Sequence, residues 1–263
     1  IMPVHLYGQM CHMDALCNLA QRHGLLMVED AAEALGSREG GRHAGTFGDA
    51  GTFSFFGNKL ITTGEGGMLL FREPAVASRA RMLRDHGMDP QRRYWHIEVG
   101  YNYRMTNLQA AVGLAQLEHI DALLAAKLRL AARYRIGLSG LEPLIELPTT
   151  RQGTLHSYWN FPVLLMSTVD QRVRDDLMQR LREAGVDPRP LFHPLHEMPP
   201  YRDLHRQGEC PVSSSVSRRG FTLPSSPKVT DAEADYICGT IRRELDRQNW
   251  REQIKTGAGG CSA

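Results

Sequence analysis

The chain has 263 residues, of which 42% are hydrophobic and 23% are charged. This is enough apolar material for one large or two modest globular domains, and it excludes collagen-like and disordered chains. The 31 basic and 29 acidic residues leave a formal net charge of +2, a balance that points away from nucleic acid and from a membrane as partners. With no long apolar run, no recognised signal peptide and five scattered cysteines, we expect a cytoplasmic protein.

The first elements predict a strand, a helix and a strand. A strand is expected over residues 1–7, a helix over residues 13–23, and a second strand over residues 25–28. Glu29 and Asp30 follow directly after this second strand. This spacing is typical of a βαβ unit and hence of a parallel sheet. Acidic residues at the carboxyl end of such a strand lie where open α/β sheets bind their ligands.

A glycine-rich stretch follows from Gly36 to Gly67, and its glycines predict frequent bends and a close approach of the backbone to another group. Within it and just after it we expect strands over residues 52–56 and 68–71. A basic amphipathic helix is predicted over residues 75–86.

Two capping boxes predict the starts of further helices. Residues 106–109 open a long helix that runs, with a bend, to about Leu138, and residues 230–233 open a last helix that ends near Arg247. The elements expected between them are a strand over 158–165, a helix over 170–184 and a strand over 186–192.

The change in pattern along the chain predicts two domains. We place the boundary near Gly140–Gly153, so that residues 1–140 form a large domain and residues 141–250 a small α+β domain. We expect residues 251–263 to form a tail that is frayed or not native sequence and that consists of mostly small residues from Thr256 onward.

Lys59 is the first candidate for chemistry. It lacks the flanking glycine and hydroxyl residue of a phosphate-binding P-loop. A lone lysine in a loop is by default a solvated charge, yet this one lies between an aromatic strand and an apolar pair. Desolvation there would lower its pKa and make it a nucleophilic amine.

Asp30 is the second candidate. A lysine that forms a Schiff base, together with an acid at a strand end, is the minimal set of residues for pyridoxal phosphate. The acid would keep the pyridine nitrogen of that cofactor protonated. Asp30 equally fits the N-cap of a helix that begins at Ala31, and spacing alone does not decide between the two.

Three ordered motifs carry a resemblance to a known family. They read VEDAAEALG over residues 28–36, GDAGTFSFFGNK over residues 48–59 and TTGEGGM over residues 62–68. The chain resembles the DegT/StrS-type aminotransferases, which use pyridoxal phosphate to aminate keto-sugar nucleotides, and the FFGNK sequence is most similar to the perosamine synthase-like branch. The similarity extends to further motifs up to about residue 247, at residues 100–105, 189–196 and 223–226.

The resemblance implies roles for individual residues. Lys59 would form the Schiff base, Asp30 would pair with the pyridine nitrogen and Glu33 would lie beside the ring hydroxyl. Ser54 would bind the phosphate group of the cofactor. Asn102 would reach the phosphate in the opposite protomer, so the site would belong to a homodimer.

Further residues are implied as substrate contacts. Arg104 would support the substrate or the interface between protomers, while Arg189 and His193 would border the sugar-nucleotide pocket. No metal is expected, because His193 and His196 flank Pro194 and no third ligand is evident.

The fold implied by the resemblance is α/β, with an aspartate-aminotransferase-like (fold type I) domain followed by a small α+β domain. Family chains begin on the order of a hundred residues ahead of Ile1, about one small domain's worth. That region supplies a phosphate loop and an aromatic residue that stacks on the pyridine ring. We therefore expect an N-terminally truncated chain that binds the cofactor poorly or not at all by itself.

The function expected from the resemblance is transamination of a 4-keto-6-deoxy type nucleotide sugar by an amino-acid donor such as L-glutamate, for amino-sugar and polysaccharide biosynthesis. The alternative is a non-catalytic fragment or a regulatory or interaction module that retains the fold. A sugar dehydratase of the same fold usually has histidine at the lysine position, and Lys59 disfavours it.

Overall fold

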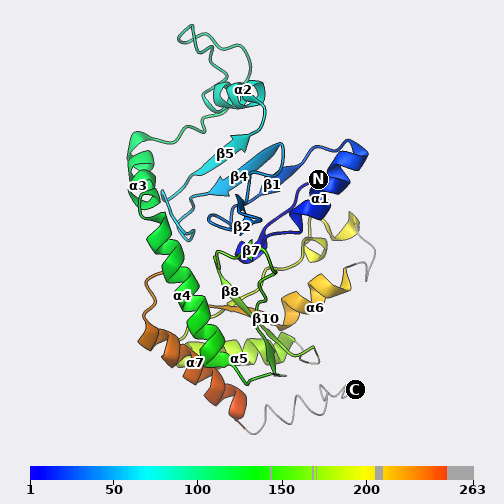
Figure 1. Cartoon of the computed structure of the whole chain (residues 1–263), viewed down its shortest axis with the longest axis vertical. Helices are drawn as coiled ribbons and strands as arrows, with labels where there is room; N and C mark the ends of the chain where they lie inside the picture. Colours follow the sequence, from blue (N-terminus) through cyan, green and yellow to red (C-terminus); the bar gives the residue numbers. More distant parts are fainter. Residues whose placement is uncertain (143, 168, 170, 205–209, 248–263) are drawn as a thin grey trace. The chain divides into compact units, whose positions relative to one another are not determined.

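The computed structural model in Figure 1 describes residues 1–142, 144–167, 169, 171–204 and 210–247. The predicted tail over 251–263 and Cys261 lie outside these residues, as does Asp170. The chain divides into two compact units, and the division falls within one helix. Unit 1 comprises residues 1–125 and 150–159, and unit 2 comprises residues 126–149 and the described residues from Asn160 onward.

The sheet of unit 1 contains β1 (Val28–Asp30), β4 (Ala50–Ser54) and β5 (Gly67–Phe71), which lie side by side in that order (Figure 1). β1 and β4 are parallel, whereas β4 and β5 are antiparallel. The parallel pairing agrees with the βαβ unit predicted from the sequence. It places the carboxyl ends of β1 and β4 at one edge of the sheet.

The predicted strand over residues 1–7 is only partly correct. The segment does lie along β1, because the N–H of Asp30 donates to Pro3 O (2.9 Å) and the N–H of His5 donates to Asp30 O (3.0 Å). It then turns into a 3₁₀-helix, η1 (Leu6–Gly8), in which Tyr7 has a φ of 56°. Since this backbone conformation is incompatible with a strand, the extended segment ends before Leu6.

The second predicted strand is shifted along the chain. Leu25 and Leu26 are exposed and follow the left-handed Gly24 that ends α1 (Met13–His23), so the strand begins only at Val28. The register with β4, in which Val28 faces Ala50 and Asp30 faces Thr52, fixes its bounds. The acidic pair therefore lies inside β1 and not after it.

The core of unit 1 forms where α1 and the loops around β1 pack together. Phe53 of β4 packs against this cluster. Gly51 permits the close packing, because a Cβ atom there would lie 2.2 Å from Gly45 O. The buried residues of the cluster are Met10, Met13, Ala20, Met27, Ala31, Ala34, Ala44 and Phe47.

The remaining helices of this half of the chain follow the sequence pattern. α2 spans Pro74–Arg84, α3 spans Asn107–Leu117 and α4 spans Ile120–Leu138. The predicted capping box is present, with the N–H of Gln109 donating to Thr106 Oγ1. The predicted bend is the break between α3 and α4.

A small sheet of three two-residue strands completes unit 1: β2 (Arg38–Glu39), β3 (Arg42–His43) and β7 (Thr154–Leu155).

Unit 2 is built on a four-stranded antiparallel sheet in the order β6-β8-β10-β9. Every residue of β10 is buried. The strands are β6 (Ile145–Glu146), β8 (Phe161–Leu165), β9 (Arg189–Pro190) and β10 (Gly220–Leu223). The other helices are α5 (Gln171–Glu183), α6 (Pro211–Arg219), α7 (Asp231–Asp246), η2 (Leu195–Glu197) and η3 (Arg202–Leu204).

Two sequence expectations in unit 2 need correction. The strand expected over 186–192 is reduced to Arg189–Pro190, because a proline lacks the N–H that a longer ladder requires. The strand expected over 158–165 begins only at Phe161, since Tyr158 has a φ of 49°. The last helix begins at the predicted capping box of Thr230 and Glu233.

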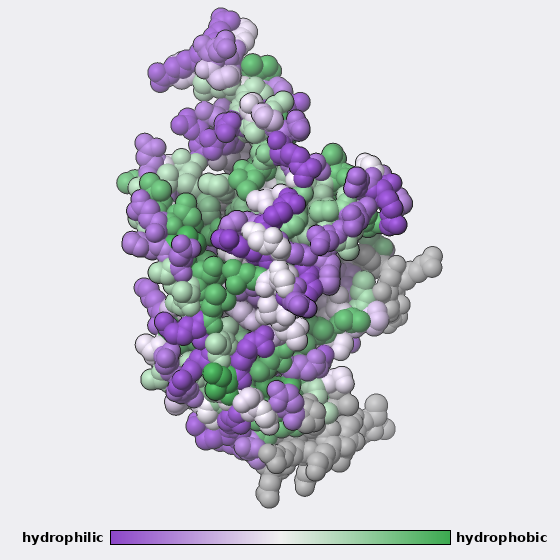
Figure 2. Space-filling model, in the orientation of Figure 1, coloured by the Kyte–Doolittle hydropathy of each residue, from purple (hydrophilic) through white to green (hydrophobic). Residues whose placement is uncertain are grey.

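Large apolar side chains remain exposed in several places, and apolar and charged surface alternate in the space-filling view (Figure 2). On α3, Leu108, Val112, Leu114 and Leu117 are all exposed. None of the described helices is both long and apolar enough to span a membrane.

Candidate active site

Asp30 and Ser54 share one face of the sheet in unit 1. The parallel register places Asp30 beside Thr52, and alternate residues of a strand point to the same face, so Thr52 and Ser54 lie on the same side as Asp30. Both residues end their strands at the same edge. This is the edge at which open α/β sheets bind ligands.

Lys59 lies in the loop that connects β4 to β5. The loop is fixed at its base, because the N–H of Phe55 donates to Gly66 O (2.8 Å) and the N–H of Thr63 donates to Phe55 O (2.9 Å). The N–H of Lys59 donates to Phe56 O (3.0 Å) and closes a turn. The side chain of Lys59 is only 13% exposed, so it is not the solvated surface charge of the default interpretation.

The amine of Lys59 has two close neighbours. Its Nζ lies 3.9 Å from Glu33 Oε1 and 4.0 Å from the centroid of the Trp159 ring. Burial lowers the pKa of Lys59 below its ordinary value, although the carboxylates of Glu33 and Asp30 oppose that shift. The lowered pKa increases the fraction of neutral, nucleophilic amine at a given pH.

The carboxylate of Glu33 is held by a backbone hydrogen bond. Its Oε2 accepts the backbone N–H of Tyr7 at 2.7 Å, so the turn at η1 fixes the carboxylate beside Lys59. Burial raises the pKa of Glu33, whereas the N–H of Tyr7 and the charge of Lys59 oppose the increase. Lys59 and Glu33 thus form a partly buried pair whose pKa values move toward each other.

Asp30 does not cap a helix. Residues 31–36 form turns, and Asp30 Oδ1 accepts the N–H of Ala32 at 3.0 Å in a local turn of its own. The helix N-cap alternative is therefore wrong. Ser54 is half-buried, and its Oγ accepts the N–H of Phe56 at 3.2 Å.

Glu29 supports the site from the other face of β1. Its buried carboxylate accepts the N–H groups of Gly45 (2.8 Å), Phe47 (2.5 Å) and Gly48 (2.6 Å), and it lies 3.1 Å from His5 Nε2. Burial tends to raise the pKa of Glu29, but the hydrogen bonds lower it below its ordinary value. This network ties the loop before β4 to β1, and hence sets the position of Asp30.

Comparisons with known proteins identify the family of this chain. The model of the DegT/DnrJ/EryC1/StrS aminotransferase family matches residues 1–242. The chain belongs to this family. The resemblance stated from the sequence is thereby confirmed, and with it the α/β fold class.

Individual relatives support the same assignment. The chain is 44% identical over 245 residues to the GDP-perosamine synthase of Caulobacter vibrioides, covering 93% of this chain and 66% of the relative. It is 38% identical over 252 residues to a dTDP-3-amino-3,4,6-trideoxy-alpha-D-glucose transaminase of Streptomyces venezuelae, covering 94% and 64%. The chain thus spans about two thirds of the length of the curated relatives that it matches.

Solved structures of the family share the fold. The crystal structure of DesV from S. venezuelae, determined in complex with a ketimine intermediate, superimposes with a TM-score of 0.85 at 37% identity, covering 94% of this chain and 65% of that one. The aminotransferase TlmJ from Streptoalloteichus hindustanus gives a TM-score of 0.85 at 30% identity, with coverages of 93% and 65%.

Asn102 and Arg104, which the family resemblance added to the site, lie on another segment of unit 1. Both are exposed. Asn102 pairs with Asp85 in an isolated bridge, and Arg104 Nη1 lies 3.1 Å from Asp85 Oδ2. Asn102 and Arg104 thus share Asp85 as a partner, and among the described residues neither forms a hydrogen bond or an ion pair with Lys59, Glu33, Asp30 or Ser54. Their roles at the site stay predictions.

Arg189 and His193 belong to unit 2. Arg189 forms an exposed ion pair with Asp187 at 2.9 Å, and His193 is exposed. His196, the second histidine of this segment, lies 3.0 Å from Ser214 Oγ. Among the residues that the structure describes, no group of three or more His, Cys, Asp or Glu side chains could hold a metal ion.

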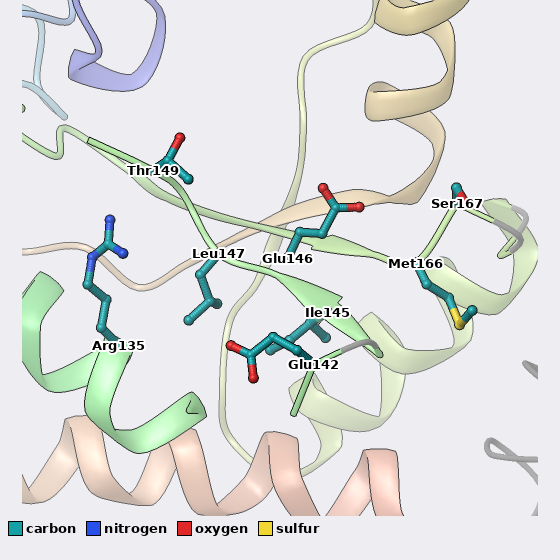
Figure 3. Close-up of a pocket in the computed structure, with 8 residues that line it drawn as sticks. All are labelled: Arg135, Glu142, Ile145, Glu146, Leu147, Thr149, Met166 and Ser167. Atoms are coloured by element: carbon teal, nitrogen blue, oxygen red, sulfur yellow. The ribbon is translucent and has the colours of Figure 1, made fainter. Parts of the chain in front are cut away.

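Unit 2 contains a separate hollow of about 690 Å³. Figure 3 shows its charged lining side chains, with the guanidinium of Arg135 on one side and the carboxylates of Glu142 and Glu146 on the other. Arg135 donates to Pro148 O and Arg219 pairs with Glu146 at 2.7 Å, so these charges are engaged within the unit. None of the predicted site residues lines this hollow.

Trp159 is a site residue that the sequence did not indicate. It lies 100 positions after Lys59 in the chain, and the family motifs do not include it. The aromatic signal in its surroundings (residues 156–161) is that of an ordinary buried strand. Only the return of residues 150–159 to unit 1 brings the indole to the amine.

Proposed function

We propose that this chain is part of a pyridoxal phosphate-dependent aminotransferase that aminates a 4-keto-6-deoxy type nucleotide sugar. The amino group would come from an amino-acid donor such as L-glutamate. The observation that carries the proposal is the partly buried amine of Lys59, 3.9 Å from Glu33, in the electrostatic field of Asp30. Membership of an aminotransferase family supports it.

The residues present fit this cofactor in their chemistry. Pyridoxal phosphate offers a carbonyl carbon for an amine, a basic ring nitrogen for a carboxylate and an anionic phosphate for a hydroxyl group. Lys59, Asp30 and Ser54 supply these three partners from one loop and one edge of the sheet. When bound, the cofactor supplies an electron sink for the carbanion formed at the substrate.

Lys59 would hold the cofactor covalently and then move a proton at the substrate carbon. Its lowered pKa supports both tasks, because a neutral amine is required to accept the proton. Asp30 would hold a proton on the ring nitrogen by its negative charge. Glu33, with its raised pKa, would lie beside the ring hydroxyl.

The other assignments complete the proposal. Ser54 would bind the phosphate through its hydroxyl group, and Asn102 would reach the phosphate in a second protomer, which makes a homodimer part of the proposed enzyme. Arg104 would support the substrate or the interface. Arg189 and His193 would contact the sugar nucleotide.

We further propose that the enzyme works in the cytoplasm, where nucleotide sugars are made and thiols stay reduced. The four described cysteines, Cys11, Cys17, Cys210 and Cys238, are free thiols.

The test is the release of 2-oxoglutarate from L-glutamate by the full-length enzyme with nucleotide sugars that carry a 4-keto group. Asp30→Asn is expected to lower kcat/KM on the order of 100-fold or more, because a fixed charge at the ring nitrogen is lost. The matched control is Asp14→Asn, which changes an exposed carboxylate on α1. Continued, multiple-turnover release that is independent of the keto sugar, or equal activities of the two variants, would overturn the proposal.

A further inference from the structure

Trp159 is anchored in unit 1 from both sides. Two residues earlier, the N–H of Ser157 donates to the buried Ser37 Oγ at 3.1 Å. The indole Nε1–H donates to Asn58 O at 2.9 Å, and the side chain is nearly buried. The ring is therefore attached to the backbone of the turn that carries Lys59.

The amine of Lys59 lies over the face of that same ring, 4.0 Å from its centroid. The distance of 3.9 Å between Lys59 Nζ and Glu33 Oε1 is about 1 Å longer than the roughly 2.7–2.9 Å that is typical of a charge-assisted N–H···O hydrogen bond. The carboxylate is therefore too far away to fix the amine by such a bond. Among aromatic side chains, tryptophan offers the most favourable face for an ammonium group. The indole is therefore the contact that defines the direction of the amine.

We propose that Trp159 is the positioning residue for Lys59. Its indole N–H donates to the carbonyl of Asn58, and the face of its ring holds the ε-ammonium group of Lys59 beside Glu33. The proposal rests on the function proposed above for Lys59. It adds a residue outside the family motifs, and it explains how a long flexible side chain is held in one orientation before the cofactor binds.

Tyr7 connects the two neighbours of the amine. Its ring lies parallel to that of Trp159, with an interplanar angle of 10° and centroids 6.3 Å apart. Its backbone N–H donates to Glu33 Oε2 at 2.7 Å. The indole, the carboxylate and the turn at Asn58 thus form one connected frame around the amine.

The sequence makes a direct test practicable, because the chain has only four lysines, Lys59, Lys127, Lys228 and Lys255. Reductive methylation with ¹³C-formaldehyde gives one set of dimethylamine resonances for each lysine, and a lysine-to-arginine variant assigns each set. Protons above an aromatic face are shifted upfield by its ring current. We expect the Lys59 methyl protons to lie upfield of those of the exposed Lys228.

The comparison of variants decides the proposal. Trp159→Leu is expected to abolish the upfield shift, and Trp159→Phe is expected to reduce it, because the smaller ring lacks the N–H that binds Asn58 O. The matched control, Trp95→Leu, removes an indole that lies under Arg92 and is expected to leave the Lys59 resonance unchanged. A Lys59 resonance that is unshifted in the native chain, or equal in the native chain and in Trp159→Phe, contradicts the proposal.

Circular dichroism spectra of the variants separate positioning from loss of structure. If Trp159→Leu does not fold, the comparison of Trp159→Phe with the native chain decides the question. Failure of the proposed function has a different signature: borohydride trapping of pyridoxal phosphate would then miss Lys59 while the ring-current shift persists.

Discussion

Among the described residues, unit 1 contains the partly buried Lys59 and unit 2 contains the buried Lys127, and the two lysines differ in their surroundings. Lys127, 4% exposed, donates to Ser225 O in unit 2, and burial lowers its pKa to about 7. Burial also lowers the pKa of Lys59 in unit 1, but there the carboxylates of Glu33 and Asp30 act against the shift. The direction of a pKa shift therefore does not identify a reactive lysine.

The neighbours of the two amines make the distinction. Lys59 lies in a loop beside two strand ends that carry Asp30 and Ser54, it is partly accessible, and an aromatic face holds it. The amine of Lys127 donates to a backbone carbonyl that follows a fully buried strand. The first environment can present an amine to a ligand, whereas the second uses an amine to join a helix to a loop.

Removal of the carboxylate of Glu29 is expected to have the largest effect on the stability of the Lys59 region. Glu29→Ala leaves the N–H groups of Gly45, Phe47 and Gly48 and the ring of His5 without their acceptor, at a cost of about 3–5 kcal/mol in the free energy of unfolding. Urea denaturation measures this loss. Glu65→Ala, at an exposed position of the same unit, is the control; equal losses in the two variants would contradict the role given to Glu29.

The same carboxylate predicts an acid dependence. The pKa of Glu29 is lower in the folded chain than in the unfolded chain. Its contribution to the free energy of unfolding is therefore fully present at a pH above the ordinary pKa of a glutamate, and it is lost as the pH falls through the pKa of the folded chain. Below that pH, native chain and Glu29→Ala should converge in stability. A constant difference between them down to the acid transition would argue against a charged Glu29.

Lys127 predicts the opposite kind of pH dependence, in unit 2. Its folded pKa of about 7 lies below the ordinary 10.5, so the unfolded chain binds more protons between these values and the free energy of unfolding rises with pH in that window. The slope reaches about 1.4 kcal/mol per pH unit. Lys127→Met should remove this contribution, and Lys228→Met, at an exposed lysine, should retain it. Equal slopes in both variants would mean that Lys127 does not titrate as described.

The two capping boxes give the smallest effect and compare the units directly. Thr230→Ala removes the N-cap hydrogen bond of α7 and is expected to lower the free energy of unfolding by about 1 kcal/mol. Because α7 buries a continuous apolar face, we expect the whole of unit 2 to share this loss of stability. α3 has no buried residue, so Thr106→Ala should increase hydrogen exchange only within α3. Hydrogen exchange of both variants distinguishes a local loss of helix stability from a cooperative loss across the unit. Destabilisation of the whole of unit 1 by Thr106→Ala would contradict the expected difference between α3 and α7.

Local signals allowed part of the fold to be predicted. Both capping boxes were correct because a Thr with Gln or Glu three residues later satisfies its hydrogen bonds within one turn. α6 was not predicted, since its Val-Ser-Ser-Ser sequence is a poor helix former and its helix is fixed by burial of Ser217 and Arg219. The bounds of β1 likewise depend on pairing with β4, which no local pattern contains.

The candidate site shows the same division. Lys59, Asp30, Glu33 and Ser54 were predicted because they fall in short ordered motifs. The structure places Glu33 beside the Lys59 amine, and the charge of Asp30 acts on the same amine. Trp159 and Tyr7 were not found, because their contribution depends on a distant segment and on a left-handed turn. Contacts of this kind follow from tertiary packing and not from spacing.

The central claim is that Lys59 is the amine that binds the cofactor, and borohydride trapping tests it most directly. The 263-residue chain is incubated with excess pyridoxal phosphate and reduced, which makes the linkage permanent even where affinity is low, and the modified lysine is identified by peptide mapping. Modification is expected to concentrate on Lys59, to be abolished in Lys59→Ala and to be retained in Lys127→Ala. Modification spread evenly over the four lysines, or persisting in Lys59→Ala, would contradict it.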